Sequence, residues 1–497
     1  MAVETFDVIV LGGGPGGYVA AIRAAQRGYR TACIDVAQLG GVCNNVGCIP
    51  TKALLESAAY AARVEHLADF GITVGEVRRD LAQAARRARQ VADQGARGVA
   101  YLFRKHAVEF VPGWGRLVSG APAGPPFGGT GAHRVAVGAP ADGVAGNPIG
   151  VVGGAGGRPV AERVLEARHV ILATGSRAKG LPMLRPDGDR VWSSDQAVYP
   201  PTIPASLVVV GAGAVGMEFA DVYASFGARV TVVEAADRVL PVEDAEVSAV
   251  VEKVYKKRGI AVHTGVRLER TEVGADGVRV HVTLRDGAAT TLEAERVLAA
   301  VGRAPVTEGI GLAEAGVELT ERGFVKVDAR MRTNVPGLYA IGDLAGGALL
   351  AHKAWAEAAA VVGGIAQDPY VAVDYGNIPS VTYCHPEVAS VGLTEAAARA
   401  EGFEVSVGKF PWSANGRARG MGETDGFVKV VRNARYGELL GAHLVGPHAS
   451  ELIGEFVVGR LLETTVEEFD LAVHPHPTLS DAIPEAALDS FGRAVHL

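Results

Sequence analysis

The chain has 497 residues, which at about 150 residues per domain predicts three to four domains. Its 48 basic and 55 acidic side chains give a formal charge of −7, which argues against the basic surface that nucleic acids require. Hydrophobic residues make up 48% and charged residues 21%, which argues against global disorder. No apolar run of about 18 residues is free of Gly, Pro or charge, so no membrane-spanning segment is expected.

Cysteine content and the first residues bear on the compartment. The chain has four cysteines, Cys33, Cys43, Cys48 and Cys384, and they do not form the disulfide framework that is typical of secreted proteins. The N-terminal residues lack a basic n-region and lead directly into a Gly-rich turn, so they predict a strand rather than a signal peptide. We therefore expect a cytoplasmic protein. The 65 glycines and only 6% aromatic residues favour an α/β fold with tight phosphate-binding turns.

A strand–turn–helix–strand pattern opens the chain. Residues 6–11 form an apolar, β-branched run that predicts a buried strand. Gly12, Gly14 and Gly17 follow, then a helical pattern and a second strand that ends near Asp35. One such glycine motif is a weak signal by itself.

The same pattern recurs 199 residues later. The run 207–210 leads to Gly211, Gly213 and Gly216, then to a helical pattern and a strand that ends at Glu234. Two copies with this context are a strong signal for two dinucleotide sites.

These residues have a physical role at a dinucleotide. The outer glycines allow a tight turn and close helix packing, and the middle one lets the backbone approach a pyrophosphate. The acids Asp35 and Glu234 would accept hydrogen bonds from a ribose diol, and a 2′-phosphate would meet like charge there. The second site should therefore prefer NAD to NADP. The alternative is a tight turn without a ligand.

The rest of the chain changes character several times. Residues 77–106 have a charged, Ala-rich helical pattern, and 119–160 are Gly/Ala/Pro-rich, which predicts strands with an enlarged surface loop. Residues 337–343 predict a strand that runs into a turn, and 349–366 predict a helix. From about residue 375, short strands mix with helices and no glycine motif occurs, which predicts a separate α+β domain.

The segment 40–52 carries a close cysteine pair. On a regular helix, five residues rise about 7.5 Å, whereas a disulfide needs Cα atoms about 4.4–6.8 Å apart. Cys43 and Cys48 can therefore pair only across a distortion, with Cys43 in the entering turn and Cys48 in the first helical turn; Pro50 fits near the helix start. A thiol at a helix N-terminus has a stabilised thiolate, which disulfide exchange requires. Zinc binding and two unpaired structural thiols are the alternatives.

Two dinucleotide sites and a cysteine pair imply an electron path. NAD carries two electrons as hydride, and a disulfide accepts two electrons through thiolate chemistry, so a flavin is needed to connect them. Because Cys43 lies close to the first glycine motif, the first site should hold FAD and the second NAD.

The C-terminal segment 473–481 offers a base. Histidine as a residue type can act as a base in thiol exchange, which makes His474 and His476 candidates, and Asp481 could orient a histidine ring. Alternatively, Thr478 and Asp481 form a capping box that begins the following helix. Both roles can hold together.

These motifs, in this order, resemble the dihydrolipoyl dehydrogenases of the two-cysteine (class I) pyridine nucleotide-disulfide oxidoreductase family. The resemblance covers essentially the whole chain. The segments that carry it are GGGPGGYVAAI at 12–22, GGVCNNVGCIPTKALLE at 40–56, ATGS at 173–176, GAGAVGMEFA at 211–220, VGRAPV at 301–306, GLYAIGDLAGGALLAHKA at 337–354, YCHPEVASVGLTE at 383–395 and HPHPTLSD at 474–481.

The resemblance implies roles for individual residues. Cys43 would attack the substrate, Cys48 would lie beside the flavin, and His476, oriented by Asp481, would be the general base. Lys52 would lie near the flavin and pair with Glu218. Further FAD contacts would be Gly115, Thr174, Gly175, Ser176, Asp343, Leu349, Leu350, Ala351 and His352. Val266 and Gly302 would join the second motif at NAD. No metal is implied.

The resemblance also implies an architecture. We expect two Rossmann-like FAD/NAD(P)-binding domains and a C-terminal α+β dimerisation domain. The expected limits are 1–180 for the FAD domain with its enlarged loop, 181–305 for the NAD domain, 306–375 for a central domain that completes the FAD site, and 376–497 for the interface domain. In a homodimer, the last domain would complete the partner's active site.

The expected reaction is oxidation of dihydrolipoamide to lipoamide with reduction of NAD, on lipoyl-bearing proteins of 2-oxoacid dehydrogenase or glycine-cleavage complexes. One alternative is a related disulfide reductase of the glutathione or mercuric type. A glutathione-type reductase would usually use NADP, which Glu234 disfavours and Arg238 would favour. A mercuric reductase would have a C-terminal cysteine pair, and no cysteine follows Cys384. A redox-silent assembly subunit is another. Two positions depart from the family: Asp481 stands where Glu is usual, and Asp35 where Glu is common.

Overall fold

The computed structural model describes residues 3–36, 38–118, 131–139, 162–369 and 372–497. The chain forms two compact units, each with its own sheets and core. The first unit joins Met1–Ala53, Ala85–Lys179 and Arg303–Val373, and the second joins Leu54–Ala84, Gly180–Gly302 and Asp374–Leu497. The four domain limits expected from the sequence stay a prediction. Most of the stretch 119–160 lies outside the described residues.

The first unit is built on a seven-stranded sheet with a parallel centre. Its strands are β1 (Val3–Leu11), β2 (Thr31–Asp35), β3 (Glu109–Pro112), β4 (Trp114–Val118), β5 (His133–Gly138), β6 (Arg163–Leu172) and β17 (Leu338–Ala340). The order is β3-β2-β1-β6-β5-β4, and β17 pairs with the end of β6. Strands β1, β2, β3, β6 and β17 are parallel, as the near-continuous apolar runs predict, whereas β4 and β5 are antiparallel.

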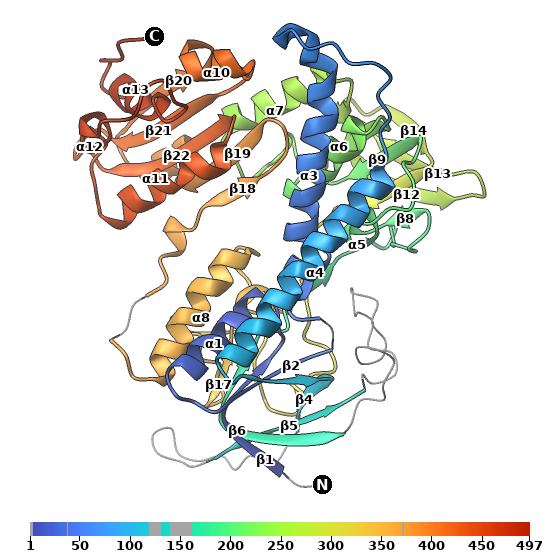
Figure 1. Cartoon of the computed structure of the whole chain (residues 1–497), viewed down its shortest axis with the longest axis vertical. Helices are drawn as coiled ribbons and strands as arrows, with labels where there is room; N and C mark the ends of the chain where they lie inside the picture. The colour runs from blue at the N-terminus through green and yellow to red at the C-terminus, as the bar shows by residue number, and fades with distance from the viewer. Residues whose placement is uncertain (1–2, 37, 119–130, 140–161, 370–371) are drawn as a thin grey trace. The chain divides into compact units, whose positions relative to one another are not determined.

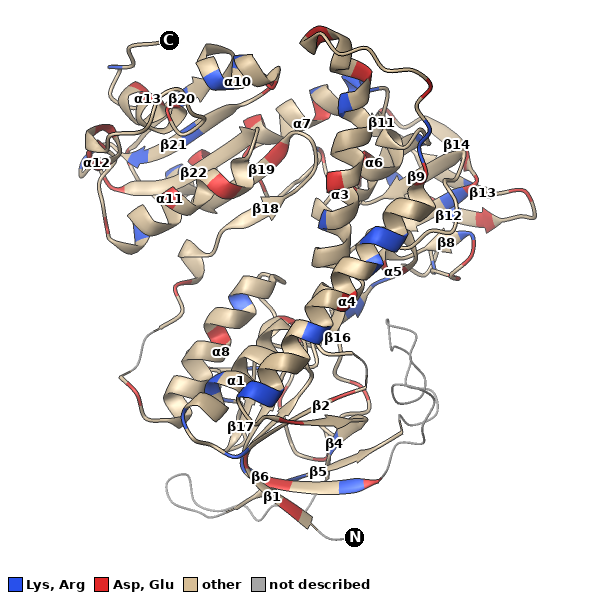
Figure 2. Ribbon diagram, in the orientation of Figure 1, with Lys and Arg blue, Asp and Glu red and all other residues tan. Residues whose placement is uncertain are grey.

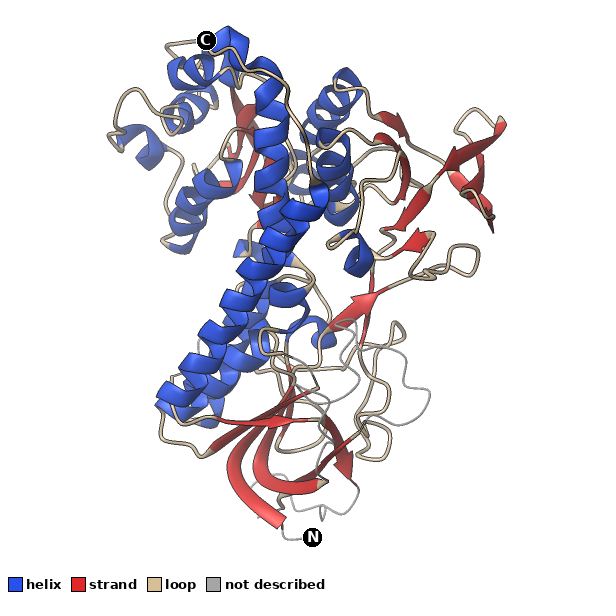
Figure 3. Ribbon diagram, turned by 45° about the vertical axis from the view of Figure 1, so that its right-hand side comes forward, coloured by secondary structure: helices blue, strands red, loops and turns tan. Residues whose placement is uncertain are grey.

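Two helices cover one face of this sheet side by side, α1 (Pro15–Gln26) and α8 (Ala351–Ile365) (Figure 1; Figure 3). They approach closely because Gly16 has no side chain: an added Cβ would lie 3.2 Å from both Ala354 Cβ and Ile341 Cδ1. A further short pair, β7 (Ser176–Ala178) and β16 (Arg303–Pro305), is antiparallel and joins two distant segments of this unit.

Two helices run from one unit into the other, α3 (Cys48–Arg63) and α4 (Leu81–Lys105), and the short α2 (Gly41–Asn45) precedes α3. Helix α4 begins four residues later than its charged pattern predicts. Asp80 explains the difference, since its carboxylate accepts a hydrogen bond from Gln83 N at 2.9 Å, as an N-cap does.

The second unit begins with a parallel five-stranded sheet of order β11-β10-β9-β15-β8. Its strands are β8 (Val191–Trp192), β9 (Ser206–Val210), β10 (Arg229–Val233), β11 (Ala261–His263) and β15 (Arg296–Ala299), with helices α5 (Ser194–Ala197), α6 (Ala214–Ser225) and α7 (Ala245–Lys257). An antiparallel sheet of β12 (Arg267–Val273), β13 (Val278–Thr283) and β14 (Ala289–Ala294) accompanies it.

The C-terminal part of this unit is an antiparallel sheet of order β18-β19-β22-β21-β20. Its strands are β18 (Ser380–Thr382), β19 (Glu387–Gly392), β20 (Val405–Pro411), β21 (Phe427–Asn433) and β22 (Leu439–Gly446). The accompanying helices are α9 (Glu395–Ala400), α10 (Gly416–Met421), α11 (Ala449–Leu461), α12 (Glu467–Leu471) and α13 (Ala482–Asp489). Helices α11 and α13 share one apolar core with the sheet. The separate α+β character expected after residue 375 is thus present.

Positive and negative side chains are mixed over the described residues, without one large region of a single sign. Figure 2 shows Lys and Arg interspersed with Asp and Glu over the described parts of the chain. No helix among the described residues combines the length and apolar character needed to cross a membrane.

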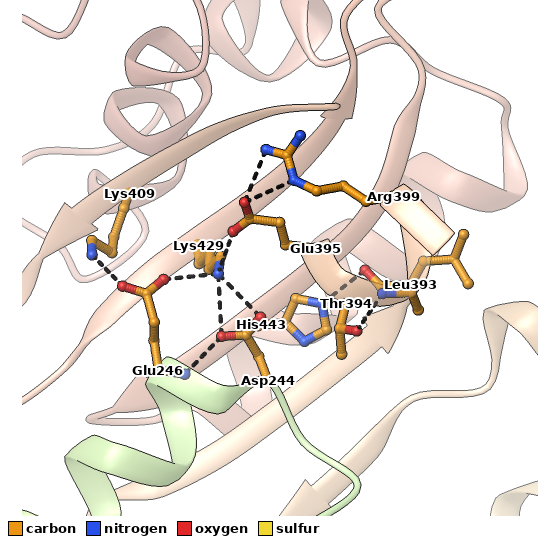
Figure 4. Close-up of polar contacts among 10 residues, drawn as sticks. Asp244, Glu246, Leu393, Thr394, Glu395, Arg399, Lys409, Lys429 and His443 are labelled. Carbon is orange, nitrogen blue, oxygen red and sulfur yellow. Dashed lines mark hydrogen bonds and ion pairs between the residues drawn. The ribbon is translucent and has the colours of Figure 1, made fainter. Parts of the chain in front are cut away.

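A buried ion cluster joins α7 to the C-terminal sheet (Figure 4). Lys429 of β21 has a side chain only 2% exposed, and its Nζ lies 3.1 Å from Asp244, 2.8 Å from Glu246 and 3.1 Å from Glu395. Asp244 is also the N-cap of α7 and accepts a hydrogen bond from Glu246 N. Burial disfavours the charged amine, but the three carboxylates outweigh it and raise the pKa of Lys429.

Replacing Lys429 by Met should destabilise the protein by about 3–5 kcal/mol at pH 7, because the buried Asp244 carboxylate would lose its ion-pair partner. The pKa values of Glu246 and Glu395 are lowered despite burial, by bonds to Lys409 and Lys429 and to Arg399 and Lys429 respectively. Their stabilisation is therefore present above the ordinary glutamate pKa of 4.5 and is lost as the pH falls through their lowered values.

The difference between the variant and the original protein should therefore shrink below about pH 4. Urea unfolding followed by tryptophan fluorescence at pH 7 and at pH 4 measures both quantities. Lys409→Met is the matched control: Lys409 pairs with Glu246 at 2.7 Å but is 44% exposed, so its loss should cost less than about 1 kcal/mol. Equal losses in the two variants would contradict the assignment.

Candidate active site

The first glycine-rich turn lies between β1 and α1. An added Cβ at Gly12, where φ is +104°, would lie 2.3 Å from Ala173 O, and one at Gly17 would lie 1.7 Å from Gly12 O. The chain itself thus requires glycine at both positions. At Gly14 the nearest atom would be Gly41 Cα at 3.9 Å, so the turn stays open there.

The second turn, between β9 and α6, repeats this geometry. An added Cβ at Gly211 would lie 2.3 Å from Ala300 O, and one at Gly216 would lie 1.8 Å from Gly211 O. An added Cβ at Gly213 would meet nothing within 4 Å. Gly14 and Gly213 are the N-cap residues of α1 and α6, and neither helix has a side-chain cap. Open backbone at an uncapped helix N-terminus fits a pyrophosphate, so both turns fit a dinucleotide.

The two acids that follow the second strands hold these turns. Asp35 Oδ2 accepts a hydrogen bond from Gly13 N at 2.5 Å. Glu234 Oε2 accepts one from Ala212 N at 2.6 Å, and its Oε1 accepts one from Ala236 N at 2.8 Å. A carboxylate has about four acceptor positions, so both acids can still bind ribose hydroxyls.

The other predicted FAD residues belong to the first unit. Gly115 lies in β4, where an added Cβ would come within 3.1 Å of Ile34 Cγ2 and 3.3 Å of Leu11 Cγ, so packing alone explains this glycine. Thr174 Oγ1 donates to Val306 O at 2.7 Å, and Gly175 adopts φ +72° with open space at its Cα.

Ser176 and Asp343 are brought together although 167 residues separate them: Ser176 Oγ donates to Asp343 Oδ2 at 2.5 Å. Arg303, which sequence reasoning missed, donates its Nε to Ser176 Oγ at 2.6 Å and a second nitrogen to Ser176 O at 2.7 Å. Its position within the motif at 301–306 was the available signal. Arg303 thereby holds Asp343 through Ser176, and its Nε also lies 3.9 Å from Asp343 Oδ2.

The segment Leu349–His352 forms the half-buried N-terminus of α8, which has no side-chain cap. Sequence reasoning missed the ion pair behind it. Lys353 and Glu357 are 0% and 1% exposed, and their charged groups lie 2.9 Å apart. Lys353 Nζ also donates to Gly342 O and Gly346 O, and Gly342 N donates to Glu357, so the pair fixes the 3-10 turn Gly342–Ala345 that carries Asp343.

The predicted NAD residues belong to the second unit. Val266 is buried and donates its N–H to Glu234 O at 2.9 Å, and Gly302 adopts φ +106° with nothing within 4 Å of an added Cβ. Glu218 of α6 is 4% exposed and accepts a hydrogen bond from Tyr383 N at 3.0 Å. The pairing of Glu218 with Lys52, which belongs to the other unit, stays a prediction.

The cysteine pair lies beside the first turn. Gly40 N donates to Gly13 O at 2.8 Å, and an added Cβ at Gly41 would lie 2.6 Å from Gly14 Cα. Cys43 is on the separate short helix α2 rather than in a plain turn, and Cys48 is the first residue of α3. The two thiols are in the reduced form, without a disulfide between them; Cys43 is half-buried and Cys48 is exposed.

The side chain of Cys43 is hydrogen-bonded to that of Cys48, and this bond together with burial raises the pKa of Cys43 well above its usual range. The Lys52 ammonium and the Cys48 backbone N–H act in the opposite direction. The sequence predicted Cys48 in the first helical turn, and Cys48 is indeed the first residue of α3, the position at which a helix N-terminus favours a thiolate. Two neighbouring thiols cannot both ionise easily, so the pair readily gives up only its first proton.

The two histidines of the C-terminal segment have different surroundings. His476 Nδ1 lies 2.8 Å from Asp481 Oδ2, and its side chain is 81% exposed. His474 is 10% exposed, and both its ring nitrogens have partners: Nε2 bonds Glu455 Oε1 and Nδ1 bonds Ala472 O, each at 2.9 Å. His476 alone therefore presents an Nε2 to solvent while a carboxylate holds its Nδ1.

The capping box expected at this segment needs a correction. Helix α13 begins at Ala482, so Asp481 itself is the N-cap residue, and it makes no side-chain cap bond. Only one half of the box is formed, the bond from Thr478 N to Asp481 Oδ2 at 3.0 Å. The carboxylate faces back toward Thr478 and His476 because the chain turns before the helix starts.

Among the described residues, no group of three or more His, Cys, Asp or Glu side chains is arranged to hold a metal ion.

Comparison with known proteins identifies the family. The pyridine nucleotide-disulphide oxidoreductase model matches residues 6–358, and the dimerisation domain of the same family matches residues 378–487. The chain is 43% identical to a dihydrolipoyl dehydrogenase of Rhizobium etli and 44% identical to one of Zymomonas mobilis, each over 99% of both chains.

Solved structures agree with this assignment. LpdA from Mycobacterium tuberculosis is 29% identical, with a TM-score of 0.85 over 98% of this chain and 99% of that one. The flavoprotein disulfide reductase RclA from Escherichia coli, at 23% identity and a TM-score of 0.80 over 96% of this chain and 98% of that one, shows the shared fold. The expected fold class is confirmed, and the dimerisation domain supports a homodimer. The chain therefore belongs to the pyridine nucleotide-disulphide oxidoreductase family, among its dihydrolipoyl dehydrogenases.

Proposed function

We propose that this chain oxidises a dihydrolipoyl group to the cyclic lipoyl disulfide and reduces NAD, with Cys43 and Cys48 as the redox-active pair. The observation that carries the proposal is the hydrogen-bonded contact of the two thiols beside the first dinucleotide turn. The relatives named dihydrolipoyl dehydrogenase, which match over 99% of the chain, support the same substrate class. FAD and NAD, when bound at the two turns, supply the route by which two electrons leave the dithiol as hydride.

The chain's own groups account for the thiol chemistry. A substrate thiolate attacks Sγ of Cys43 in the oxidised pair, forms a mixed disulfide and releases Cys48 as a thiolate. His476 takes the proton of the second substrate thiol through its exposed Nε2. The resulting thiolate closes the lipoyl disulfide and releases Cys43. Asp481, bonded to Nδ1, holds the ring and stabilises its charged form.

The remaining site residues are proposed in supporting roles. Asp343, set by Ser176 and by the buried Lys353–Glu357 pair, would orient the flavin end of the first site. Glu234 favours a ribose diol and therefore NAD. We propose lipoyl-bearing proteins of 2-oxoacid dehydrogenase or glycine-cleavage complexes as partners, and a homodimer in which His476 serves the partner's cysteine pair. The cytoplasmic location stays a prediction.

An anaerobic titration of the purified flavoprotein with dihydrolipoamide tests the function. We expect a long-wavelength thiolate-to-flavin absorption band, followed by formation of NADH when NAD is added. A spectrum that dihydrolipoamide leaves unchanged but NADH alters would contradict this substrate and indicate another disulfide. A spectrum that neither reagent alters would favour a redox-silent subunit.

A further inference from the structure

Asn44, which directly follows Cys43 in the chain, makes contacts that the proposed function does not use. Asn44 and Asn45 are the last two residues of α2. Asn45 is fully buried and donates its Nδ2 to Gly41 O at 2.9 Å and to Leu39 O at 3.3 Å. It therefore ties α2 back to the turn that precedes it.

Asn44 instead reaches α4, which lies about fifty residues further along the chain. Its Nδ2 donates to Ala92 O at 2.8 Å and to Asn45 Oδ1 at 3.2 Å. Ala92 and Gly95 lie three residues apart and thus share one face of α4. The amide of Asn44 consequently lies against a single turn of α4.

Gly95 makes this contact possible. An added Cβ at Gly95 would lie 2.0 Å from Asn44 Oδ1, far closer than side chains tolerate. Two hydrogen bonds of Nδ2 hold Asn44 in this place. Gly40 must also lack a side chain, because an added Cβ there would lie 2.5 Å from Asn44 Cβ. Asn44 thus fits between two glycines, Gly40 and Gly95.

Glycine in the interior of a helix destabilises the helix relative to alanine, so the presence of Gly95 in α4 needs a structural explanation. Helix α4 offers an internal comparison: an added Cβ at Gly98 would meet nothing within 4 Å. Gly98 is therefore free to change, whereas Gly95 is required by Asn44.

We propose that Asn44 is a positioning residue for the redox pair, and that Gly95 forms the notch in α4 that receives it. Since Cys43 directly precedes Asn44 on the five-residue helix α2, fixing Asn44 on α4 fixes the place of the Cys43 sulfur relative to Cys48 at the start of α3. Disulfide formation tolerates only a limited range of Cα separations, so a shift of α2 by about 1 Å should slow closure of the pair. This inference rests on the proposed function and adds to it the residues that hold the thiols in register.

The test compares Gly95→Ala with Gly98→Ala in the holoenzyme. Gly95→Ala should slow dihydrolipoamide-dependent NAD reduction by roughly 10- to 100-fold, the effect of a misplacement of about 1 Å. It should slow closure of the Cys43–Cys48 disulfide by oxidised dithiothreitol to a similar extent, measured by mass spectrometry of alkylated peptides. Electron transfer from NADH to ferricyanide should stay within about twofold, since it bypasses the disulfide. Gly98→Ala should match the original protein in all three measurements.

A double variant separates steric fit from general damage. Asn44→Ala removes the amide and should slow disulfide closure only several-fold, and Asn44→Ala with Gly95→Ala should return to that level, because the clash is gone. The proposal is overturned if Gly95→Ala closes its disulfide at the original rate, if the double variant is as slow as Gly95→Ala, or if ferricyanide reduction falls in parallel.

Two further outcomes are distinguishable. If Gly95→Ala does not fold, Asn44→Ala alone decides, and an unchanged closure rate in that variant contradicts the proposal. If dihydrolipoamide fails to reduce the original protein, the proposed substrate is wrong, but closure by oxidised dithiothreitol still compares the variants and tests the positioning role.

Discussion

Replacing Cys43 by Ser should reduce dihydrolipoamide-dependent NAD reduction by about 10³-fold or more. A hydroxyl cannot form the mixed disulfide, and residues that act as a unit lose nearly all activity when one member is removed. Transfer from NADH to ferricyanide should continue, because the dinucleotide turns at Gly14 and Gly213 are untouched. Steady-state assays of both reactions on the same preparation measure the contrast.

Cys384→Ser is the matched control for that variant. Cys384 is buried, and its Sγ lies 3.2 Å from Pro386 O, so a serine hydroxyl can replace the thiol there. Burial raises the pKa of this thiol, which keeps it protonated and unreactive. Its replacement should leave lipoamide turnover within about twofold. If Cys43→Ser kept its turnover, the interchange role would be wrong, and unchanged function of the whole assembly would favour a redox-silent subunit.

The second large effect is expected at His476. His476→Gln should lower lipoamide turnover by about 10²- to 10⁴-fold, the usual contribution of a positioned general base. Glutamine can still bond Asp481 but cannot take a proton, so the fold of the segment should be kept. Transfer from NADH to an artificial acceptor involves no substrate thiol and should be spared.

His474→Gln provides the comparison within the same segment. Both nitrogens of His474 are bonded inside the protein, to Glu455 and to Ala472 O, so its ring is not available as a base. We expect a loss well below that of His476→Gln. If the two variants lost activity equally, or if His476→Gln lost both activities together, the base assignment would be wrong.

The sequence predicted the parts of the structure that repeat or alternate locally. The constant offset of 199 residues between the two glycine motifs reappears as helices α1 and α6, whose bounds differ by the same number. Gly17 and Gly216 belong to this local pattern, because each is required by a backbone oxygen five residues earlier, Gly12 O and Gly211 O. His476 and Asp481 were also predictable as a pair, because only five residues separate them.

Contacts across long stretches of chain were not predictable in this way. Arg303 lies in the motif at 301–306, but nothing in the sequence indicates its partner Ser176, which is 127 residues away. No sequence periodicity indicates the buried ion pair of Lys429 and Asp244, which are 185 residues apart. The capping box failed for a different reason: the spacing of Thr478 and Asp481 fits a helix start, but the chain turns once more before α13, and the carboxylate bonds His476 instead.

The carboxylate of Glu234 has a consequence for how coenzyme preference can evolve. In its proposed role it discriminates against a 2′-phosphate by charge, and it also accepts hydrogen bonds from the N–H groups of Ala212 and Ala236. A single substitution that admits the phosphate therefore leaves two backbone donors without their acceptor, at a cost of about 1–3 kcal/mol for each one that stays buried. A switch to NADP would require a second change that satisfies those donors. The turn that positions the nucleotide thus makes the present coenzyme choice hard to reverse in one mutational step.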